Sequence, residues 1–252
     1  MNKIFLIDGH SILNRAFYGL PDLMNSEGLH TGAVYGFLNI LFKVLGEEKP
    51  EYLAVAFDRS EPTFRHEKYS EYKGTRKSMP EELKQQIPIL KEMLEKMGIS
   101  TVSLAGYEAD DILGTLAKKA ESDNLDVTIL SGDRDLLQLV TGKILVRLPR
   151  TIKGQTLIET YNEEKVKEHF SLTPSQIVDL KALMGDAADN IPGILGVGEK
   201  TATRLITEYG SVENAFAHVD EIPQKCARES LRENYSMAQL SKELAAIDTD
   251  CP

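Results

Sequence analysis

Cysteine, tryptophan and long apolar runs are scarce or absent in this chain of 252 residues. Its two cysteines, Cys226 and Cys251, have neither the spacing of a metal motif nor the number needed for a disulfide framework, which favours a reducing compartment. The best candidate for a membrane span, residues 34–45, is interrupted by Asn39 and Lys43. No secretory signal fits the N-terminal residues, so we expect a cytoplasmic protein without a membrane partner.

A basic excess is also lacking, because 39 acidic residues against 29 basic ones give a formal net charge of −10. Proteins that bind nucleic acid normally carry a basic surface, so this charge at first argues against such a partner. However, nine of the acids are assigned below to one metal-binding edge. The other acids nearly balance the basic residues, and nucleic acid is therefore not excluded.

The order of the predicted elements is that of an α/β protein. Strand and helix signals alternate through about residue 130, and the length suits one large domain or one and a half ordinary ones. Helices are predicted over residues 33–45 and 80–97, the second with a kink at Pro88. A strand pair over 143–148 and 156–161 encloses a turn at residues 150–154, and the later signals are helical. We place the domain boundary near residue 160, between domains 1–160 and 161–252.

Four apolar runs in the first domain each lead into acidic residues. The runs cover residues 4–7, 53–57, 102–105 and 127–130 and are predicted to be parallel strands. Because parallel strands end at the same edge of a sheet, their carboxylates should converge where such sheets bind ligands. Acids crowded in this way repel one another unless divalent cations bind among them. The acids concerned are Asp8, Asp58, Glu108, Asp110, Asp111, Asp133 and Asp135.

A structural explanation of these acids has to be weighed as well. Aspartate is common after a strand because it caps the next helix, so any one of these residues alone is better explained as a cap. A cap needs only one acid per junction. Residues 108–111 and 133–135 supply two or three acids within a turn, and this favours a metal site.

A basic segment with interleaved aromatic residues lies between the second run and the helix at residue 80. Residues 65–77 contain five Lys or Arg against two Glu, together with Tyr69 and Tyr72. Cations that meet phosphates and rings that stack on bases suit a single nucleic-acid strand. An ordinary solvated connector is the alternative. The position of the segment directly after Asp58 favours the nucleic-acid interpretation.

The second half of the chain adds two more features. Asp186 and Asp189 are spaced to share one face of a helical turn and would join the acidic edge. Gly196 and Gly198 then precede a helix, where backbone N–H groups can approach a phosphate, and Lys200 and Thr201 can add contacts. A Gly-x-Gly sequence is most often only a turn, and this one lacks the spacing of a dinucleotide motif or a P-loop.

Together these motifs resemble the flap endonuclease family, in the form of the 5′ nuclease domain of bacterial DNA polymerase I. The resemblance runs in order from residue 3 to about 210 and more weakly to the C-terminus. The chain departs from the usual pattern at Gly32, Ala188 and Leu195, where Asn, Ser and Pro are expected. The motifs lie at residues 8–11, 57–58, 64–67, 72–76, 106–111, 132–135 and 196–202.

The resemblance implies a PIN-like α/β fold with a mainly parallel sheet flanked by helices. It implies a helical arch over about residues 59–98 and a helix-hairpin-helix-type subdomain that grips duplex DNA. Two divalent cations are expected, Mg²⁺ with Mn²⁺ as a substitute, with many contacts through water. The first is assigned to Asp8, Asp58, Glu108 and Asp110, and the second to Asp133, Asp135 and Asp186, with Asp111 and Asp189 in support.

The resemblance also implies roles in DNA binding. Lys73 and Arg76 would contact the scissile phosphate, and Tyr72 would stack on a base. Gly196, Gly198, Lys200 and Thr201 would bind the duplex backbone, with a K⁺ ion at the hairpin.

The function expected from these assignments is that of a structure-selective 5′ nuclease. It would act as a monomer on DNA with a free 5′ end or flap, or on an RNA-primer/DNA hybrid, in primer removal and repair. The last residues, 247–252, resemble a join to a polymerase domain. A stand-alone flap endonuclease, a small-molecule phosphohydrolase and a non-catalytic module that binds DNA structures are the alternatives.

Overall fold

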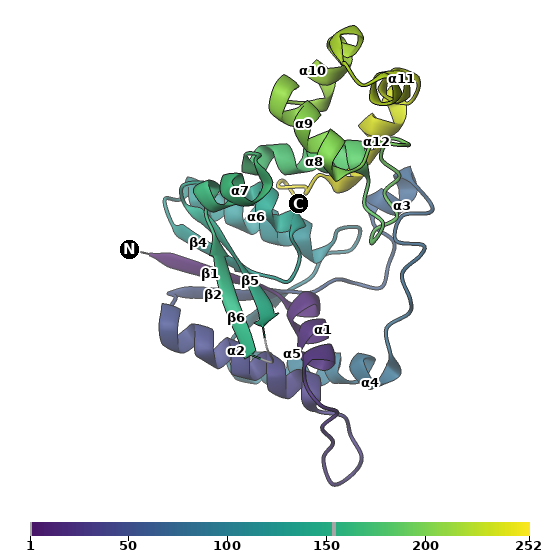
Figure 1. The fold of residues 1–252 in the computed structure, drawn as a ribbon. Helices are drawn as coiled ribbons and strands as arrows, with labels where there is room; N and C mark the ends of the chain where they lie inside the picture. The colour runs from purple at the N-terminus through teal and green to yellow at the C-terminus, as the bar shows by residue number, and fades with distance from the viewer. Residues whose placement is uncertain (1, 153–154) are drawn as a thin grey trace.

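A mainly parallel sheet forms the centre of the first domain (Figure 1). The computed structural model describes residues 2–152 and 155–252, so Lys153 and Gly154 of the predicted turn lie outside the described residues. The strand order is β3-β2-β1-β4-β5-β6, with β6 antiparallel to β5 and all other pairs parallel. The strands are β1 (Lys3–Asp8), β2 (Tyr52–Ala56), β3 (Ser100–Val102), β4 (Asp126–Leu130), β5 (Ile144–Ile152) and β6 (Gln155–Tyr161).

One strand differs from the prediction made for residues 102–105. β3 occupies Ser100–Val102, and residues 103–105 form the connection to the next helix. Only Val102 belongs to both, and its carbonyl accepts the N–H of Phe57, just past the end of β2. The acids at 108–111 still follow this strand closely.

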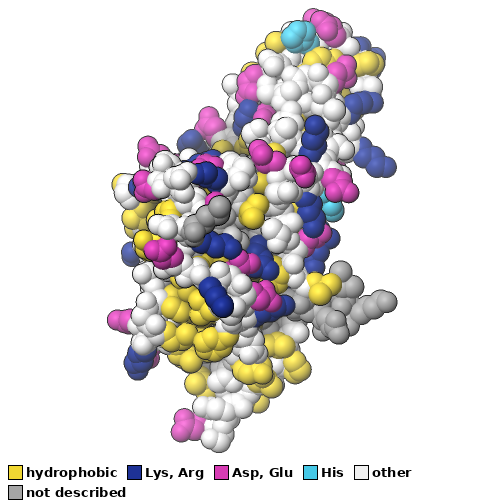
Figure 2. All heavy atoms as spheres, turned by 90° about the vertical axis from the view of Figure 1, so that its left-hand side faces the viewer, with side chains coloured by type: hydrophobic (Ala, Val, Ile, Leu, Met, Phe, Trp, Pro, Cys, Tyr) yellow, Lys and Arg dark blue, Asp and Glu magenta, His cyan; other side chains and the backbone are white. Residues whose placement is uncertain are grey.

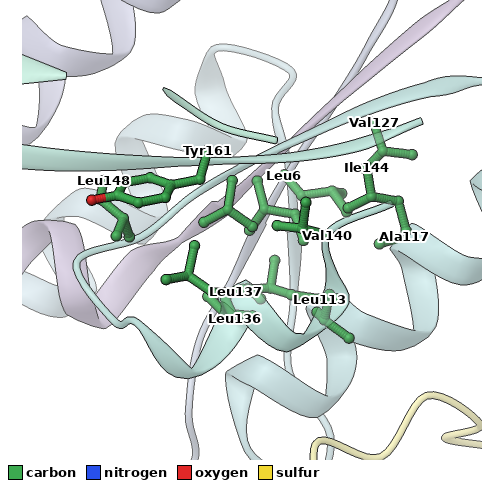
Figure 3. Close-up of a cluster of buried hydrophobic side chains, with 14 of the residues drawn as sticks. Leu6, Leu113, Ala117, Val127, Leu136, Leu137, Val140, Ile144, Leu148 and Tyr161 are labelled. Carbon is green, nitrogen blue, oxygen red and sulfur yellow. The ribbon is translucent and has the colours of Figure 1, made fainter. Parts of the chain in front are cut away.

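Helices cover both faces of the sheet because side chains alternate along each strand. Phe5 and Ile7 point into one core, against α1 (Gly9–Gly19), α2 (Gly32–Glu48) and α5 (Gln86–Lys96). Leu6 points into the other core, where α6 (Ala109–Ser122) and the 3-10 helix η1 (Asp135–Leu139) pack. Figure 3 shows this second core, which includes Leu6, Leu113 and Leu137, with the ring of Tyr161 beside Leu148.

The chain after residue 160 first packs on the sheet domain. Helix α7 (Glu163–Phe170) contributes the fully buried Val166 to the same core as Leu6. The boundary predicted near residue 160 would therefore separate α7 from the core in which it packs, and it stays a prediction. The helical part that follows has its own core, which includes Leu183, Leu205 and Leu231. Its elements are η2 (Pro174–Gln176), α8 (Ile177–Met184), α9 (Glu199–Tyr209), α10 (Val212–Ala217), η3 (Val219–Glu221), α11 (Lys225–Glu233) and α12 (Tyr235–Ala245).

The arch expected over residues 59–98 stays a prediction. This segment contains α3 (Phe64–Lys68), a connector over residues 69–80, α4 (Glu81–Lys84) and α5, and Leu83 of α4 and Leu90 of α5 are buried in the core of Phe5. In Figure 1 this segment runs along the side of the molecule from α3 to α4. The helix predicted over 80–97 is interrupted at Gln85, one turn before Pro88, because proline cannot donate to the carbonyl of Lys84 and its ring crowds that carbonyl.

The surface of the described residues includes several exposed apolar side chains, and no helix there has the length and apolarity to cross a membrane. Tyr35 and Phe42 on α2 are about half exposed. Figure 2 shows apolar side chains gathered over the lower part of one face, with charged side chains of both signs above them. Exposed apolar side chains are ordinary on folded proteins, so this face by itself indicates no function.

A tight hairpin between α8 and α9 begins at Asp186. Asp186 and Ile191 exchange backbone hydrogen bonds of 2.9 and 2.8 Å. The backbone pieces on either side of the hairpin are in close contact at Gly185 and Gly193, whose φ angles are +73° and +62°. A Cβ atom on Gly193 would lie 2.2 Å from the backbone nitrogen of Gly185, so this position admits only glycine.

We expect Gly193→Ala to lower the free energy of unfolding by about 2 kcal/mol or more, because the added methyl group forces the two backbone pieces apart and the residue has a left-handed conformation. Urea denaturation measures this change. The matched control is Gly142→Ala, where a Cβ atom would meet nothing within 4 Å. An equal and small effect of the two substitutions would show that this close contact does not hold the hairpin.

Candidate active site

The carboxylates predicted to converge are placed by the ends of the central strands. Asp8 ends β1 and caps α1, with its Oδ1 accepting the N–H of Ser11 at 3.0 Å and its Oδ2 accepting the hydroxyl of Ser131 at 2.7 Å. Asp58 follows β2, and its Oδ1 accepts the N–H of Ala109 at 2.8 Å. Asp8 is thus a helix cap and Asp58 binds the first N–H of α6, and both also line a pocket, so the two interpretations of these acids are compatible.

A pocket of about 590 Å³ lies at this edge of the sheet. Its acidic side chains come from the ends of the strands and from the start of α6. The Lys and Arg side chains that line it are Arg59, Lys73, Arg76, Lys84 and Lys91. The acids that line it are Asp8, Asp58, Glu108, Asp110 and Asp133.

A second pocket, also of about 590 Å³, continues from the first across Asp133. Asp135 and Asp186 line it, and so do Gly198 and Glu199 at the start of α9. Gly198 and the start of α9 therefore lie next to the acidic edge. Lys181 of α8 lies between the two acids and donates hydrogen bonds to Asp135 Oδ1 and Asp186 Oδ2.

Burial and mutual repulsion keep several of these acids from ionising at their usual pH. Burial, with the nearby charges of Asp58 and Asp133, raises the pKa of Asp8 from 3.8 to about 7. Burial also raises the pKa of Asp110 well above 3.8, and Asp133, Asp8 and Asp58 add to this effect. Burial, with the nearby charge of Asp133, also raises the pKa of Asp135 to about 7, although Lys181 opposes the shift.

This set of donors suits hard divalent cations. Oxygen ligands that repel one another in a poorly solvated site are the kind that Mg²⁺ and Ca²⁺ prefer. Within residues 2–152 and 155–252, no three His, Cys, Asp or Glu side chains are grouped closely enough to hold an ion by themselves. The assignment of the acids to metals thus stays a prediction, and water would have to complete the coordination.

Asp111, predicted to support the metal site, has several hydrogen-bond partners within the protein. Its side chain is fully buried, and its two oxygens accept hydrogen bonds from the Arg65 guanidinium at 2.7 Å each. It also accepts the backbone N–H groups of Glu108 and Asp248 at 3.0 and 2.9 Å. These partners occupy the carboxylate, so Asp111 holds the start of α6 and the C-terminal segment in place.

Asp189 and Tyr72 also have contacts that the sequence does not reveal. Asp189 pairs with Arg76, and Tyr72 is only 3 % exposed, with its hydroxyl donating to Glu108 and Asp189 at 3.1 and 3.2 Å. The ring packs with Leu244, so in this structure it offers no face on which a base could stack. The stacking role of Tyr72 stays a prediction, and the ring would have to leave its contacts with α12 to stack on a base.

The remaining predicted residues lie in the connector after α3 and at the start of α9. Lys73 has a φ of +55° and donates from Nζ to Glu108 Oε1 at 2.6 Å. Gly198 is the N-cap residue of α9, with Lys200 and Thr201 in its first turn. Gly196 has a φ of +79°, and the neighbouring Leu195 is 87 % exposed.

Two residues of the site were not predicted from the sequence. Lys181 is a single basic residue in the otherwise mostly apolar helix α8, and this contrast could have marked it. His10 lines the first pocket, and its Nδ1 accepts the N–H of Asp58 at 3.0 Å. Burial lowers the pKa of His10, which fits its role as a neutral acceptor.

Comparison with known families decides the kinship of the chain. Residues 3–171 match the family described as 5′-3′ exonuclease, N-terminal resolvase-like domain, and residues 172–252 match the 5′-3′ exonuclease, C-terminal SAM fold. The chain belongs to the 5′-3′ exonuclease family. The fold class and the resemblance expected from the motifs are confirmed.

Two curated relatives of this exonuclease chain are bacterial DNA polymerases. It is 52 % identical to DNA polymerase I of Bacillus caldotenax over 250 residues and 51 % identical to that of Bacillus subtilis strain 168. Each match covers 99 % of this chain and 28 % of the relative. The chain thus spans little more than a quarter of the length of these relatives.

Solved structures agree on the fold of the exonuclease chain. The T5 5′-exonuclease with bound zinc ions has a TM-score of 0.78 and 24 % identity, with 98 % of this chain and 90 % of that chain covered. The catalytic core of Rad2 in complex with DNA has a TM-score of 0.62 and 18 % identity, with 99 % and 81 % covered. At these identities the likeness shows the fold alone.

We expect Asp110→Asn to raise the melting temperature of the cation-free protein at about pH 8 and to raise it much less at about pH 5. In the folded state the pKa of Asp110 is well above 3.8, so the folded protein holds a proton that the unfolded chain has lost. Stability contributed by that proton therefore falls as the pH rises through the folded pKa. Calorimetry in EDTA measures both melting temperatures.

The control for this prediction is Asp123→Asn, at the exposed C-cap of α6. It should change the melting temperature equally little at both pH values. A gain from Asp110→Asn that is as large at pH 5 as at pH 8 would contradict the effect of charge repulsion.

Proposed function

We propose that this chain is a structure-selective 5′ nuclease that hydrolyses phosphodiester bonds near the junction of a free 5′ strand and a duplex. The observation that carries the proposal is the first pocket. Carboxylates at the ends of β1, β2 and β4 line it together with Lys73 and Arg76 of the connector after α3. A phosphate held between them would meet cations from the arch and any metal bound by the acids.

The acids are proposed to hold two divalent cations, Mg²⁺ with Mn²⁺ as a substitute. Asp8, Asp58, Glu108 and Asp110 would bind the first, and Asp133, Asp135 and Asp186 the second. When bound, the cations would supply a water of lowered pKa and neutralise charge on the leaving oxygen. Asp189 would act indirectly, since it pairs with Arg76. Asp111 holds the frame through Arg65.

The arch cations are proposed to neutralise the charge that develops on the scissile phosphate. Lys73 contacts Glu108 at 2.6 Å, so its ammonium already lies at the acidic edge. Arg76 is held by Asp189 and by the carbonyl of Ala188 at 3.3 Å. Both side chains could turn toward a phosphate in the pocket that they line.

The segment of residues 196–201, at the start of α9, is proposed to bind the duplex beside the cleaved strand. Gly196 and Gly198 leave the backbone at the start of α9 accessible, because a Cβ atom on Gly198 would meet nothing within 4 Å. Backbone N–H groups there suit a phosphate, and Lys200, Thr201 and a K⁺ ion would add to the contact. Such contacts select shape instead of base sequence. Figure 2 shows Lys and Arg side chains along one flank of the helical part.

The wider biological role is a proposal based on the relatives, which are DNA polymerases I. The domain would act as a monomer in the cytoplasm, beside a linked polymerase domain, in primer removal and DNA repair. A 5′ flap or an RNA-primer/DNA hybrid would be the substrate. A small-molecule phosphohydrolase would have no use for the arch and the segment of residues 196–201, and a module without catalysis would not need the acidic edge. The relatives also make a stand-alone flap endonuclease the less favoured alternative.

We expect the protein to cut a 5′-flap duplex near the junction in Mg²⁺ and to leave the same substrate intact in EDTA. The product should carry a 5′ phosphate, which gel sizing beside a phosphorylated marker will show. Asp135→Asn should abolish cleavage but retain DNA binding, because it removes one negative charge near the phosphate. Asp123→Asn serves as the control. Full turnover by Asp135→Asn would refute the metal assignment.

We expect Lys73→Ala to lower the single-turnover rate by ~10²-fold or more, while the Kd for the flap substrate changes little. The reason is that a cation which stabilises the transition state affects the chemical step more than ground-state binding. Lys77→Ala, in the same exposed connector, is the matched control. A loss of affinity with an unchanged rate would instead make Lys73 an electrostatic tether for the strand.

A further inference from the structure

The acids of the metal-binding edge differ in what neutralises them. Glu108 is paired with Lys73 at 2.6 Å, and Asp189 is paired with Arg76. By contrast, Asp8, Asp58, Asp110 and Asp133 line one pocket, where their like charges face the same space. Four acids of the first pocket therefore repel one another.

The second pocket has a different arrangement. Lys181 Nζ donates to Asp135 Oδ1 and to Asp186 Oδ2, and it thereby bridges η1 and the Asp186 hairpin. The lysine side chain is 13 % exposed, and the two acids are 14 % and 18 % exposed. Lys181 is a residue of α8, and this helix packs against η1 and α12. The ammonium is thus a positive charge built into the place where these two acids converge.

We propose that Lys181 is an internal counter-ion of the second cation position, and that a second divalent cation binds there only by displacing the lysine ammonium. This inference rests on the two-cation site proposed above. Lys181 is then a positioning residue, because it acts through Asp135 and Asp186 and not on the substrate.

Displacement makes the two cation positions unequal. A cation that binds among Asp8, Asp58, Glu108 and Asp110 displaces one lysine contact, that of Lys73 with Glu108, and relieves repulsion among the other three acids. A cation that binds between Asp135 and Asp186 must first break two charge-assisted hydrogen bonds and expose an ammonium. The first position should therefore fill at a lower cation concentration than the second.

Calorimetric titration of the full chain with Mn²⁺, without DNA, tests this proposal. The parent protein should show a tight and a weak class of sites. Lys181→Met and Lys181→Gln should tighten the weak class by ~10-fold or more, because the competing charge is gone. Lys181→Arg keeps the charge and should keep the class weak.

The matched control is Lys242→Met. Lys242 of α12 also bridges two acids, Asp179 and Glu213, with distances of 2.6 and 2.9 Å, but it does not line either pocket. Its substitution should leave both classes of Mn²⁺ sites unchanged. An unchanged or weakened second class in the folded Lys181→Met and Lys181→Gln variants would overturn the proposal.

A second measurement on the parent protein remains decisive if those variants do not fold. Nuclear magnetic resonance should detect the Lys181 ammonium as a slowly exchanging signal, assigned by its loss in Lys181→Arg. The signal should survive the first equivalent of Mg²⁺ and disappear with the second. Its persistence at saturating Mg²⁺ would overturn the inference.

The outcomes also separate this inference from the proposed nuclease function. If Lys181→Met tightens Mn²⁺ binding but the parent does not cleave a flap, the counter-ion role stands and the nuclease function falls. If the parent cleaves the flap in Mg²⁺ while Lys181 has no influence on either measurement, only the counter-ion role falls.

Discussion

The buried ion pair between Arg65 and Asp111 joins the parts of the molecule on which the site depends. Both side chains are almost inaccessible, at 2 % and 0 % exposure. Burial of such a pair is costly unless every polar atom has a partner. Here Arg65 also donates to the carbonyls of Leu244 and Ala246 at 2.9 and 2.7 Å, so α3, α6 and the C-terminal segment are fixed together. Glu108, Tyr72 and Lys73 are placed by this junction, since each lies within one or two contacts of it.

The acidic edge shows how a fold can tolerate a site that works against its own stability. The carboxyl ends of β1, β2 and β4 must meet because the strands are parallel and adjacent. Buried carboxylates at such an edge raise one another's pKa, and the protein reduces the cost with local donors. Ser131 and the N–H of Ser11 serve Asp8, and the N–H of Ala109 serves Asp58. The remaining negative charge is what a cation can use.

The sequence predicts those parts of the structure that follow from strand periodicity. The sheet, the order of its acids and the start of α9 at Gly198 depend on local patterns, so they could be inferred. The role of Asp111 depends on Arg65, which lies 46 residues away, and Tyr72 is buried by contacts with Leu244. Partners so distant along the chain leave no local signal. For the same reason the sequence could not show that α4 and α5, within the residues assigned to the arch, pack into the core of Phe5.

The close contact of Gly185 and Gly193 places Asp186 on a loop of the helical part, whereas Asp8 and Asp58 stand on the sheet. The helical core and the sheet domain are joined at α8, because Ile177 belongs to the core of Leu6 while Leu183 belongs to the helical core. The distance between the two halves of the acidic edge is therefore set by how α8 lies on the sheet domain. A substitution that moves α8 would change the spacing of the carboxylates without altering any of them.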